Sequence, residues 1–360
     1  MTAGSGLPSL SGDGSAGAVL SEAAPLVGAA EAAAILARLY GVDGSLQALP
    51  SERDHNFRVR TEGQVDYVLK IAHPGEPRAV TDFQTEALRH IAAVDPGLPV
   101  PRVMPTRDGE FASDFARDDG PPRTVRLLTY LPGRLLIEAR RTAAQDRALG
   151  AFLARLGRAM RGFFYPAAAQ ADLLWDLRQM PRCRAFMPAI TDPRLRALVA
   201  QTIDAAEAHA LVVLPGFRAQ VVHNDLNPSN AVVAETDPDR VAGVIDFGDM
   251  LHGPLVCDLA VGAAYRWAED EHPLAGVARF AAGYHGVTPL EDAEIDILLD
   301  LVRGRLALTL AIVAWQAARS PDKHGYVMRF NAELWRFLDG LSQVTRDEAR
   351  RIIRAEIIGG

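Results

Sequence analysis

The 360-residue chain has few cysteines and no long apolar run. Its two cysteines, Cys183 and Cys257, lie far apart and have no CxxC spacing, which favours two reduced thiols over a metal site or a long-range disulfide. The longest uncharged run, 306–318, has thirteen residues and is too short to span a bilayer. Residues 1–17 lack the basic start and apolar core of a signal peptide. We therefore expect a cytoplasmic protein without membrane attachment.

The chain also lacks an excess of positive charge. Its 38 Lys and Arg residues stand against 45 Asp and Glu residues, a formal net charge of −7, which argues against a nucleic-acid partner. Hydrophobic residues make up 49% and charged residues 23%, an ordinary globular balance that excludes a largely disordered chain. At roughly 150 residues per domain, this length predicts two domains or one bilobal domain.

The first third of the chain is predicted to form a small, strand-rich lobe over residues 24–131, after a disordered leader at 1–23. A helix is expected near 24–40, and alternating patterns at 56–60 and 66–70 predict a β-hairpin. A second helix over 82–94 and two further strands complete this lobe.

Helical periodicity dominates the rest of the chain, residues 132–355. The exception is a pair of short apolar runs, 230–234 and 241–247, separated by turn residues, which predicts one embedded hairpin. The remaining segments are predicted helices: 143–164, 193–211, 254–267, 274–284, 292–319 and 327–353. The sequence thus predicts an α+β, bilobal fold with a β-rich N-terminal lobe and a larger, mostly helical C-terminal lobe.

Two polar motifs flank the embedded hairpin. Residues 221–230 read VVHNDLNPSN, and residues 244–249 read VIDFGD. A strand delivers Asp225 into a polar loop, Asn230 opens the hairpin, and Asp246 closes it, so the three side chains are expected to cluster at one end. A polar turn that happens to contain Asp and Asn is the alternative for either motif alone. Both motifs in this order favour a catalytic site.

The residue types fit phosphoryl transfer. Asn230 and Asp246 offer the hard oxygen ligands that Mg²⁺ prefers when it also binds substrate phosphates. Asp225 is then left to receive the proton of an attacking hydroxyl. The five-residue spacing from Asp225 to Asn230, followed by a D-F-G sequence at 246–248, is the spacing found in protein kinases.

Candidate nucleotide contacts lie in the N-terminal lobe. Lys70 ends an apolar strand, where it would hold phosphates, and Glu86 on the next helix would pair with it. A surface lysine and a solvated helix face are the alternatives. The remaining candidates are Ser51 and Asn56 in a loop above the phosphates, for which a plain hairpin loop is the alternative, and the backbone near Tyr130 and Leu131 beside the nucleobase.

At these residues the sequence resembles the aminoglycoside phosphotransferase and choline kinase superfamily, and within it most the hydroxylysine kinase group. The resemblance is carried by HNDLNPSN at 223–230 and IDFGD at 245–249, supported by SERDHNF at 51–57, YVLKI at 67–71 and LPVPR at 98–102. It implies a protein-kinase-like fold, with Asp225 as catalytic base, Asn230 and Asp246 as metal ligands and Lys70 as the phosphate-binding lysine. Asp258 would brace the catalytic loop, although an ordinary Asp at a helix start accounts for it equally well.

The resemblance and its departures together predict a small acceptor. Asn224 replaces the Arg of H-R-D, and only about a dozen residues separate Asp246 from the next helix, which leaves no room for an activation segment. An amino-acid acceptor needs a carboxylate for its ammonium group, for which Asp249 is the candidate. It also needs an Arg for its carboxylate, for which Arg305 is the candidate unless that side chain snorkels from a helix end.

The predicted reaction moves the γ-phosphoryl group of ATP or GTP, with Mg²⁺, to a hydroxyl of a small amine-bearing molecule, with 5-hydroxylysine as first choice. Homoserine, choline or an aminoglycoside are alternative acceptors. A catalytically silent kinase-like binding module and a metal-dependent hydrolase are alternatives from other classes. The sequence leaves the oligomeric state open.

Overall fold

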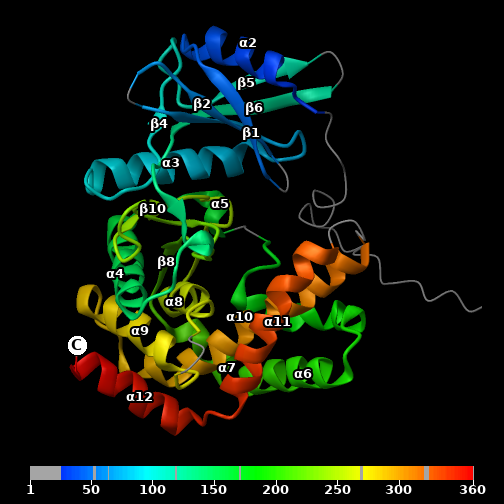
Figure 1. The fold of residues 1–360 in the computed structure, drawn as a ribbon, viewed down its shortest axis with the longest axis vertical. Coiled ribbons are helices and arrows are strands. Elements are labelled where there is room, and N and C mark those ends of the chain that lie inside the picture. The colour runs from blue at the N-terminus through cyan, green and yellow to red at the C-terminus, as the bar shows by residue number, and fades with distance from the viewer. Residues whose placement is uncertain are drawn as a thin grey trace, which may run out of the picture.

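The computed structural model has two lobes (Figure 1). It describes residues 26–51, 54–63, 65–117, 120–169, 172–267, 271–319 and 324–359. An antiparallel sheet with two helices forms the N-terminal lobe, and helices form most of the C-terminal lobe. The predicted α+β bilobal fold is confirmed, whereas the predicted leader at 1–23 lies outside the described residues.

The N-terminal sheet has six strands in the order β1-β2-β3-β6-β4, with β5 paired to β6. The hairpin predicted at 56–60 and 66–70 is β2–β3, in which Asn56 lies opposite Lys70. On its other side Lys70 lies opposite Arg126 of β6. The strands are β1 (Ser45–Leu49), β2 (His55–Arg60), β3 (Tyr67–Ile71), β4 (Val103–Met104), β5 (Ser113–Arg117) and β6 (Gly120–Thr129).

The two faces of this sheet differ in chemistry. Helix α2 (Ala29–Tyr40) packs on the outer face, where Ile35 and Leu36 join Leu69 and Leu127 in an apolar core. Helix α3 (Arg78–Val94) lies on the other side of the sheet, toward the C-terminal lobe (Figure 1). Because side chains alternate along a strand, the row Asn56, Lys70 and Arg126 faces this inner side. The inner face of the sheet therefore carries amide and cationic groups on the side of α3.

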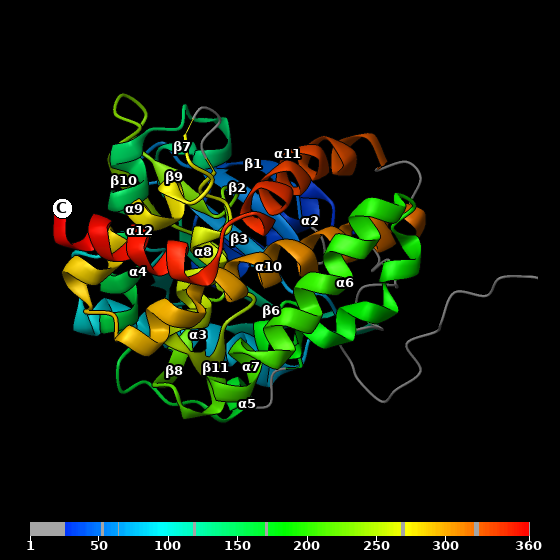
Figure 2. The ribbon, with the colours of Figure 1, turned by 90° about the horizontal axis from the view of Figure 1, so that it is seen from below.

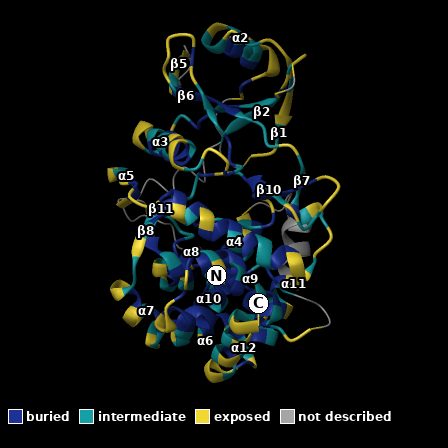
Figure 3. Ribbon diagram, turned by 90° about the vertical axis from the view of Figure 1, so that its left-hand side faces the viewer, coloured by how far each residue is buried: buried dark blue, intermediate teal, exposed yellow. Residues whose placement is uncertain are grey.

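The C-terminal lobe is built around α10, which passes through its middle (Figure 2). Buried residues concentrate around α10, and exposed residues lie along the outer helices of the lobe (Figure 3). The helices are α4 (Ala143–Ala159), α5 (Pro166–Ala169), α6 (Pro193–Ala208), α7 (Ala210–Val213), α8 (Leu255–Ala263), α9 (Ala275–Val287), α10 (Asp292–Arg319), α11 (His324–Ser342) and α12 (Arg346–Gly359), with 3-10 turns η1 (Leu136–Glu138), η2 (Leu177–Ala185), η3 (Met187–Ala189) and η4 (Leu214–Gly216).

The helix predicted over 327–353 is instead two helices, α11 and α12. The Thr345 hydroxyl accepts a hydrogen bond from the backbone N–H of Glu348, and the Glu348 carboxylate accepts one from the Thr345 N–H. This reciprocal pair is a capping box, which starts a new helix at that point. The apolar periodicity continues across the break between α11 and α12, and this explains why the sequence predicted a single helix.

Two small sheets carry the motif loops. The predicted hairpin is β9 (Ala231–Val233) paired with β10 (Val241–Val244), and β7 (Arg134–Leu135) lies beside β9. Strands β8 (Ala219–Val222) and β11 (Leu251–Pro254) form the second sheet. Gly243 has φ +150°, and a Cβ there would lie 2.5 Å from the Pro99 carbonyl oxygen. This close approach fixes the β9–β10 hairpin against the connection between α3 and β4.

Within the described residues, one stretch, 193–216, has the length and mean hydropathy of a membrane-crossing helix. It comprises α6, α7 and η4, so its helical path changes near residue 209. Val199, Ile203 and Ala206 are buried in the main core of the lobe. The stretch is thus also a packed element of the C-terminal lobe.

Candidate active site

The Asp225 carboxylate is held by three side-chain donors. It lies in the loop that follows β8, and its Oδ2 accepts hydrogen bonds from Asn227 Nδ2 at 3.0 Å and Asn230 Nδ2 at 2.6 Å. Its Oδ1 accepts one from Arg305 Nη2 at 2.9 Å. Charge-assisted bonds of this kind are among the strongest in proteins. The carboxylate is therefore fixed in orientation from two segments of the chain.

The loop before Asp225 is braced from α8. Asn224 has φ +64°, an unfavourable conformation for a residue other than glycine, and its N–H donates to Asp258 Oδ1 at 2.7 Å. Burial raises the pKa of Asp258 to about 7. Asp258 thus lies where the predicted brace would be, and its contact is to the loop backbone.

The two motifs contact each other through their ring side chains. His223 is buried and lies edge-on to Phe247, with ring centroids 4.8 Å apart. Burial lowers the pKa of His223 to about 4, so the imidazole is neutral near pH 7. Because Phe247 follows Asp246 directly, this contact keeps the D-F-G segment beside the Asp225 loop.

Asn230 and Asp246 are brought together as predicted from their order in the chain. The N–H of Ile245, one residue before Asp246, donates to the Asn230 carbonyl oxygen at 2.8 Å. The amide Nδ2 of Asn230 is used on Asp225, so its Oδ1 is the oxygen that remains for a cation. With the Asp246 carboxylate, this donor set fits a hard divalent ion.

The cation would need ligands beyond protein carboxylates. Across the described ranges, no group of three or more His, Cys, Asp or Glu side chains is placed to hold a metal ion. A site with one carboxylate and one amide oxygen suits an ion that also binds phosphate oxygens. The arrangement therefore fits a metal ion that arrives with a phosphorylated substrate.

The electrostatics of Asp225 favour a group that takes up a proton near neutral pH. Burial raises the pKa of Asp225 to about 7, and the neighbouring negative charge of Asp249 adds to that rise. The positive charge of Arg305 opposes it. The charge of Asp249 is thus near enough to raise the pKa of Asp225. This is consistent with the predicted contact between Asp249 and an acceptor ammonium group, which stays a prediction.

Arg305 lies in the middle of α10 and is 2% exposed, so the alternative of a snorkelling helix-end arginine is wrong. Besides Asp225, its guanidinium donates to the Tyr265 hydroxyl at 3.3 Å and the Trp175 carbonyl oxygen at 3.2 Å. It also lies 4.9 Å from the centroid of the Trp175 ring. The predicted contact between Arg305 and an acceptor carboxylate stays a prediction.

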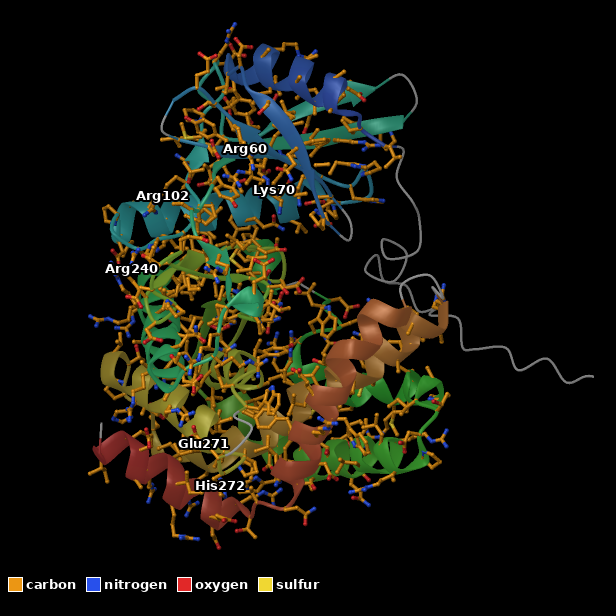
Figure 4. All side chains as sticks on the ribbon, viewed as in Figure 1. Arg60, Lys70, Arg102, Arg240, Glu271 and His272 are labelled. Carbon is orange, nitrogen blue, oxygen red and sulfur yellow. The ribbon has the colours of Figure 1, made fainter. Side chains whose placement is uncertain are left out.

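Lys70 lies on the inner face of the sheet, above α3 (Figure 4). Its Nζ is 3.8 Å from Asp54 Oδ2. The predicted pairing of Lys70 with Glu86 is wrong. Glu86 instead bonds to Arg89 one turn along α3, at 2.7 Å, with 43% of its side chain exposed. The helix turns Gln84 toward the sheet in its place, and Gln84 Oε1 accepts from Arg126 Nη2 at 2.7 Å.

The other nucleotide candidates are placed as follows. Ser51 is exposed, beside a segment that is not described, and Asn56 is the strand neighbour of Lys70. The Tyr130 N–H is used on the Asp66 carbonyl oxygen, so Leu131 carries the next N–H along the chain. Their contacts to nucleotide stay predictions.

Sequence reasoning missed four residues that line or support this region. Asn227, two positions after Asp225, carried a usable signal because it lies inside the motif. Asp54 likewise lies inside the 51–57 segment, whereas Arg126 and Trp175 carried no such signal, since each acts through a partner distant in sequence.

Residues 45–292 match the phosphotransferase enzyme family. The chain belongs to that family. Hydroxylysine kinase of Mus musculus is 29% identical over 341 residues, covering 89% of this chain and 90% of its own length. Homoserine kinase of Azorhizobium caulinodans is 30% identical over 270 residues, covering 72% and 77%. A solved structure of an amicoumacin kinase with AMP-PNP and Ca²⁺ has the same fold, with TM-score 0.62 and 20% identity, covering 83% of this chain and 90% of that one.

The predicted superfamily is thereby confirmed, and so is the class of reaction. The protein is a small-molecule kinase that transfers a phosphoryl group from a nucleotide to an alcohol group. Members of this class use a divalent metal ion, for which the oxygen set of Asn230 and Asp246 is suited.

Proposed function

We propose that this phosphotransferase acts in the cytoplasm and moves the γ-phosphoryl group of ATP or GTP to the hydroxyl of an amine-bearing small molecule, with 5-hydroxylysine as first choice. The observation that carries the proposal is the Asp225 carboxylate, held between Asn230 and Arg305 with Asp249 nearby. Similarity to hydroxylysine kinase over 89% of the chain supports this acceptor. Homoserine, choline and aminoglycosides are the alternatives within the same chemistry.

Each polar group has a role in this reaction. Asp225 accepts the proton of the acceptor hydroxyl as the hydroxyl oxygen bonds to the γ-phosphorus, while the bond from that phosphorus to the β–γ bridging oxygen breaks and the nucleoside diphosphate leaves. Asn230 Oδ1 and the Asp246 carboxylate hold Mg²⁺, which neutralises charge on the phosphate oxygens when bound. Lys70, kept on the inner face by Asp54, contacts the phosphates, and the strand end at Tyr130 and Leu131 borders the nucleobase.

Acceptor recognition depends on charge near Asp225. The Asp249 carboxylate is close enough to raise the pKa of Asp225, so an ammonium group bound to Asp249 lies near the base. An acceptor with a hydroxyl a few bonds from an amine fits this placement.

The silent binding module is the competing reading. It would keep the fold and the nucleotide site without turnover. The presence of Lys70, Asp225, Asn230 and Asp246 together favours turnover, because a binding module has no need of a fixed, proton-accepting carboxylate. A metal-dependent hydrolase would need more metal-binding side chains than the described site provides.

The test is nucleotide turnover with Mg²⁺ against 5-hydroxylysine, homoserine, choline, ethanolamine and kanamycin, with ATP and GTP supplied separately. We expect one acceptor to be phosphorylated by the native chain and not by Asp225→Asn. Nucleotide binding without turnover of any acceptor would support the binding module. Equal turnover by Asp225→Asn would contradict the role of Asp225.

A further inference from the structure

We propose that Arg305 is a positioning residue for Asp225, which directs the acceptor hydroxyl to Oδ1 of that carboxylate, and that it is not the receptor for an acceptor carboxylate. The inference rests on the proposed function, because it concerns the geometry of the same proton transfer.

The lone pairs of the Asp225 carboxylate decide which of its oxygens can receive the proton. An ionised carboxylate has about four lone-pair positions, two on each oxygen. Both positions on Oδ2 are used, by Asn227 Nδ2 and Asn230 Nδ2. Oδ1 accepts a bond from Arg305 Nη2 and keeps one position. The attacking hydroxyl must therefore deliver its proton to Oδ1, on the side where Arg305 lies.

The contacts of Arg305 suit a fixed support better than a substrate receptor. Its guanidinium is anchored on three separate segments, by the Trp175 carbonyl oxygen, the Tyr265 hydroxyl and Asp225. At 2% exposure, it has almost no surface to offer an incoming carboxylate. A planar guanidinium held this way fixes both the position and the plane of the carboxylate that it binds.

Lysine cannot reproduce this support. A lysine at position 305 keeps the positive charge but offers a compact ammonium group on a flexible stem, without the planar fork. It would keep part of the electrostatic attraction to Asp225 while losing the simultaneous bonds to Tyr265 and Trp175. The Arg305→Lys variant therefore separates the effect of positioning Asp225 from the effect of the positive charge.

The inference also defines the acceptor class. A hydroxyl bound at Oδ1 lies beside the half-buried side chains of Trp175 and Tyr265. The acceptor then needs a hydroxyl and an amine for Asp249, and its carboxyl group is dispensable. Hydroxylated amines with and without a carboxyl group are thus expected as substrates.

The experiment uses a matched pair of acceptors, 5-hydroxylysine and 1,5-diaminopentan-2-ol, which is the same molecule without the carboxyl group. With Arg305→Lys, we expect kcat to fall about tenfold or more for both acceptors, because misplacing a reacting group by ~1 Å costs up to 10²-fold. The KM for each acceptor and for nucleotide stays within threefold of the native value. Arg303→Lys is the matched control, since Arg303 lies on the same helix and bonds to the backbone carbonyls of Leu341 and Val344. It should leave kcat unchanged.

Other outcomes overturn the inference. A rise in KM confined to 5-hydroxylysine, with kcat preserved, would assign Arg305 to the acceptor carboxylate. Native kcat in Arg305→Lys with both acceptors would remove its positioning role. If the native chain phosphorylates neither acceptor, the proposed acceptor fails separately. The inference is then tested on hydrolysis of Mg-nucleotide, where water takes the place of the hydroxyl and Arg305→Lys should again lower kcat about tenfold.

Discussion

Replacing Asp258 tests how much the active loop depends on its brace. In Asp258→Ala, the buried N–H of Asn224 loses its acceptor, and the N–H of His223 loses the carboxylate that it faces. An unsatisfied buried donor costs about 1–3 kcal/mol, so we expect the free energy of unfolding to fall by about 3 kcal/mol. Asn224, at φ +64°, also loses the bond that holds it in that conformation. Because Asp225 is the next residue, kcat should fall about tenfold or more, as for other misplaced catalytic groups.

The Asp258→Asn variant is the control, because its amide oxygen still accepts a hydrogen bond while it cannot ionise. The pKa of Asp258, about 7 in the folded chain, lies above its unfolded value. The folded state therefore binds more protons between about pH 4 and pH 7, and this residue's contribution to stability is lost as pH rises through that range. At 1.36 kcal/mol per pKa unit, the loss is on the order of 4 kcal/mol.

Urea unfolding of the three proteins between pH 4 and pH 8, with kcat measured on the same samples, provides the check. The difference in unfolding free energy between native and Asp258→Asn should shift in favour of the variant as pH rises. Native stability and native kcat in Asp258→Ala would refute the bracing role. If the difference in unfolding free energy between the native protein and Asp258→Asn stays constant from pH 4 to pH 8, the ionisation of Asp258 does not contribute to stability.

Five further substitutions, in three tests, have definite expected outcomes. Asp225→Asn should lower kcat by about 10²–10⁴ with nucleotide affinity unchanged by titration calorimetry, since general-base catalysis contributes that much; weakened nucleotide binding of the same size would point to misfolding instead. Lys70→Met should raise the KM for nucleotide about tenfold in steady-state kinetics. Glu86→Gln should leave that KM unchanged and the free energy of unfolding within about 0.5 kcal/mol of native, because Glu86 bonds to Arg89 at the surface. An equal rise in KM in both variants would instead support a Lys70–Glu86 pair. Gly150→Ala should lower the melting temperature, because the added Cβ would lie 1.9 Å from the Phe280 carbonyl oxygen of α9. Gly157→Ala on the same helix should not, because the atom nearest to its Cβ is 3.7 Å away. Equal melting temperatures for the two variants would contradict the tight α4–α9 contact.

Much of the fold was predictable because the signals were local. Alternation in 56–60 and the short apolar run before Lys70 indicate a strand pair, and the two segments pair as the β2–β3 hairpin. The Asp225–Asn230 spacing likewise leaves the chain little freedom, and the two side chains are in contact. Short spacing constrains geometry, so motif residues could be placed from sequence.

The errors arose where rotation about a helix or a distant contact decides the outcome. Residue order puts Glu86 on the helix after Lys70, but the phase of α3 gives the sheet-facing position to Gln84. Arg305 was noticed as a charge within an apolar helix, yet nothing in the sequence points to Asp225, eighty residues earlier, as its partner. Only tertiary packing makes that pair.

The division of labour around Asp225 has an evolutionary consequence. The residues assigned to nucleotide and metal lie within the 45–292 segment that matches the family, whereas the counter-charge of Asp225 comes from α10, beyond it. Substitution of Arg305 would therefore change proton transfer for every acceptor, even though the phosphate-handling residues remain unchanged. A lineage of such enzymes would have to retain this α10 arginine together with the motif residues, although it lies outside the segment that defines the family.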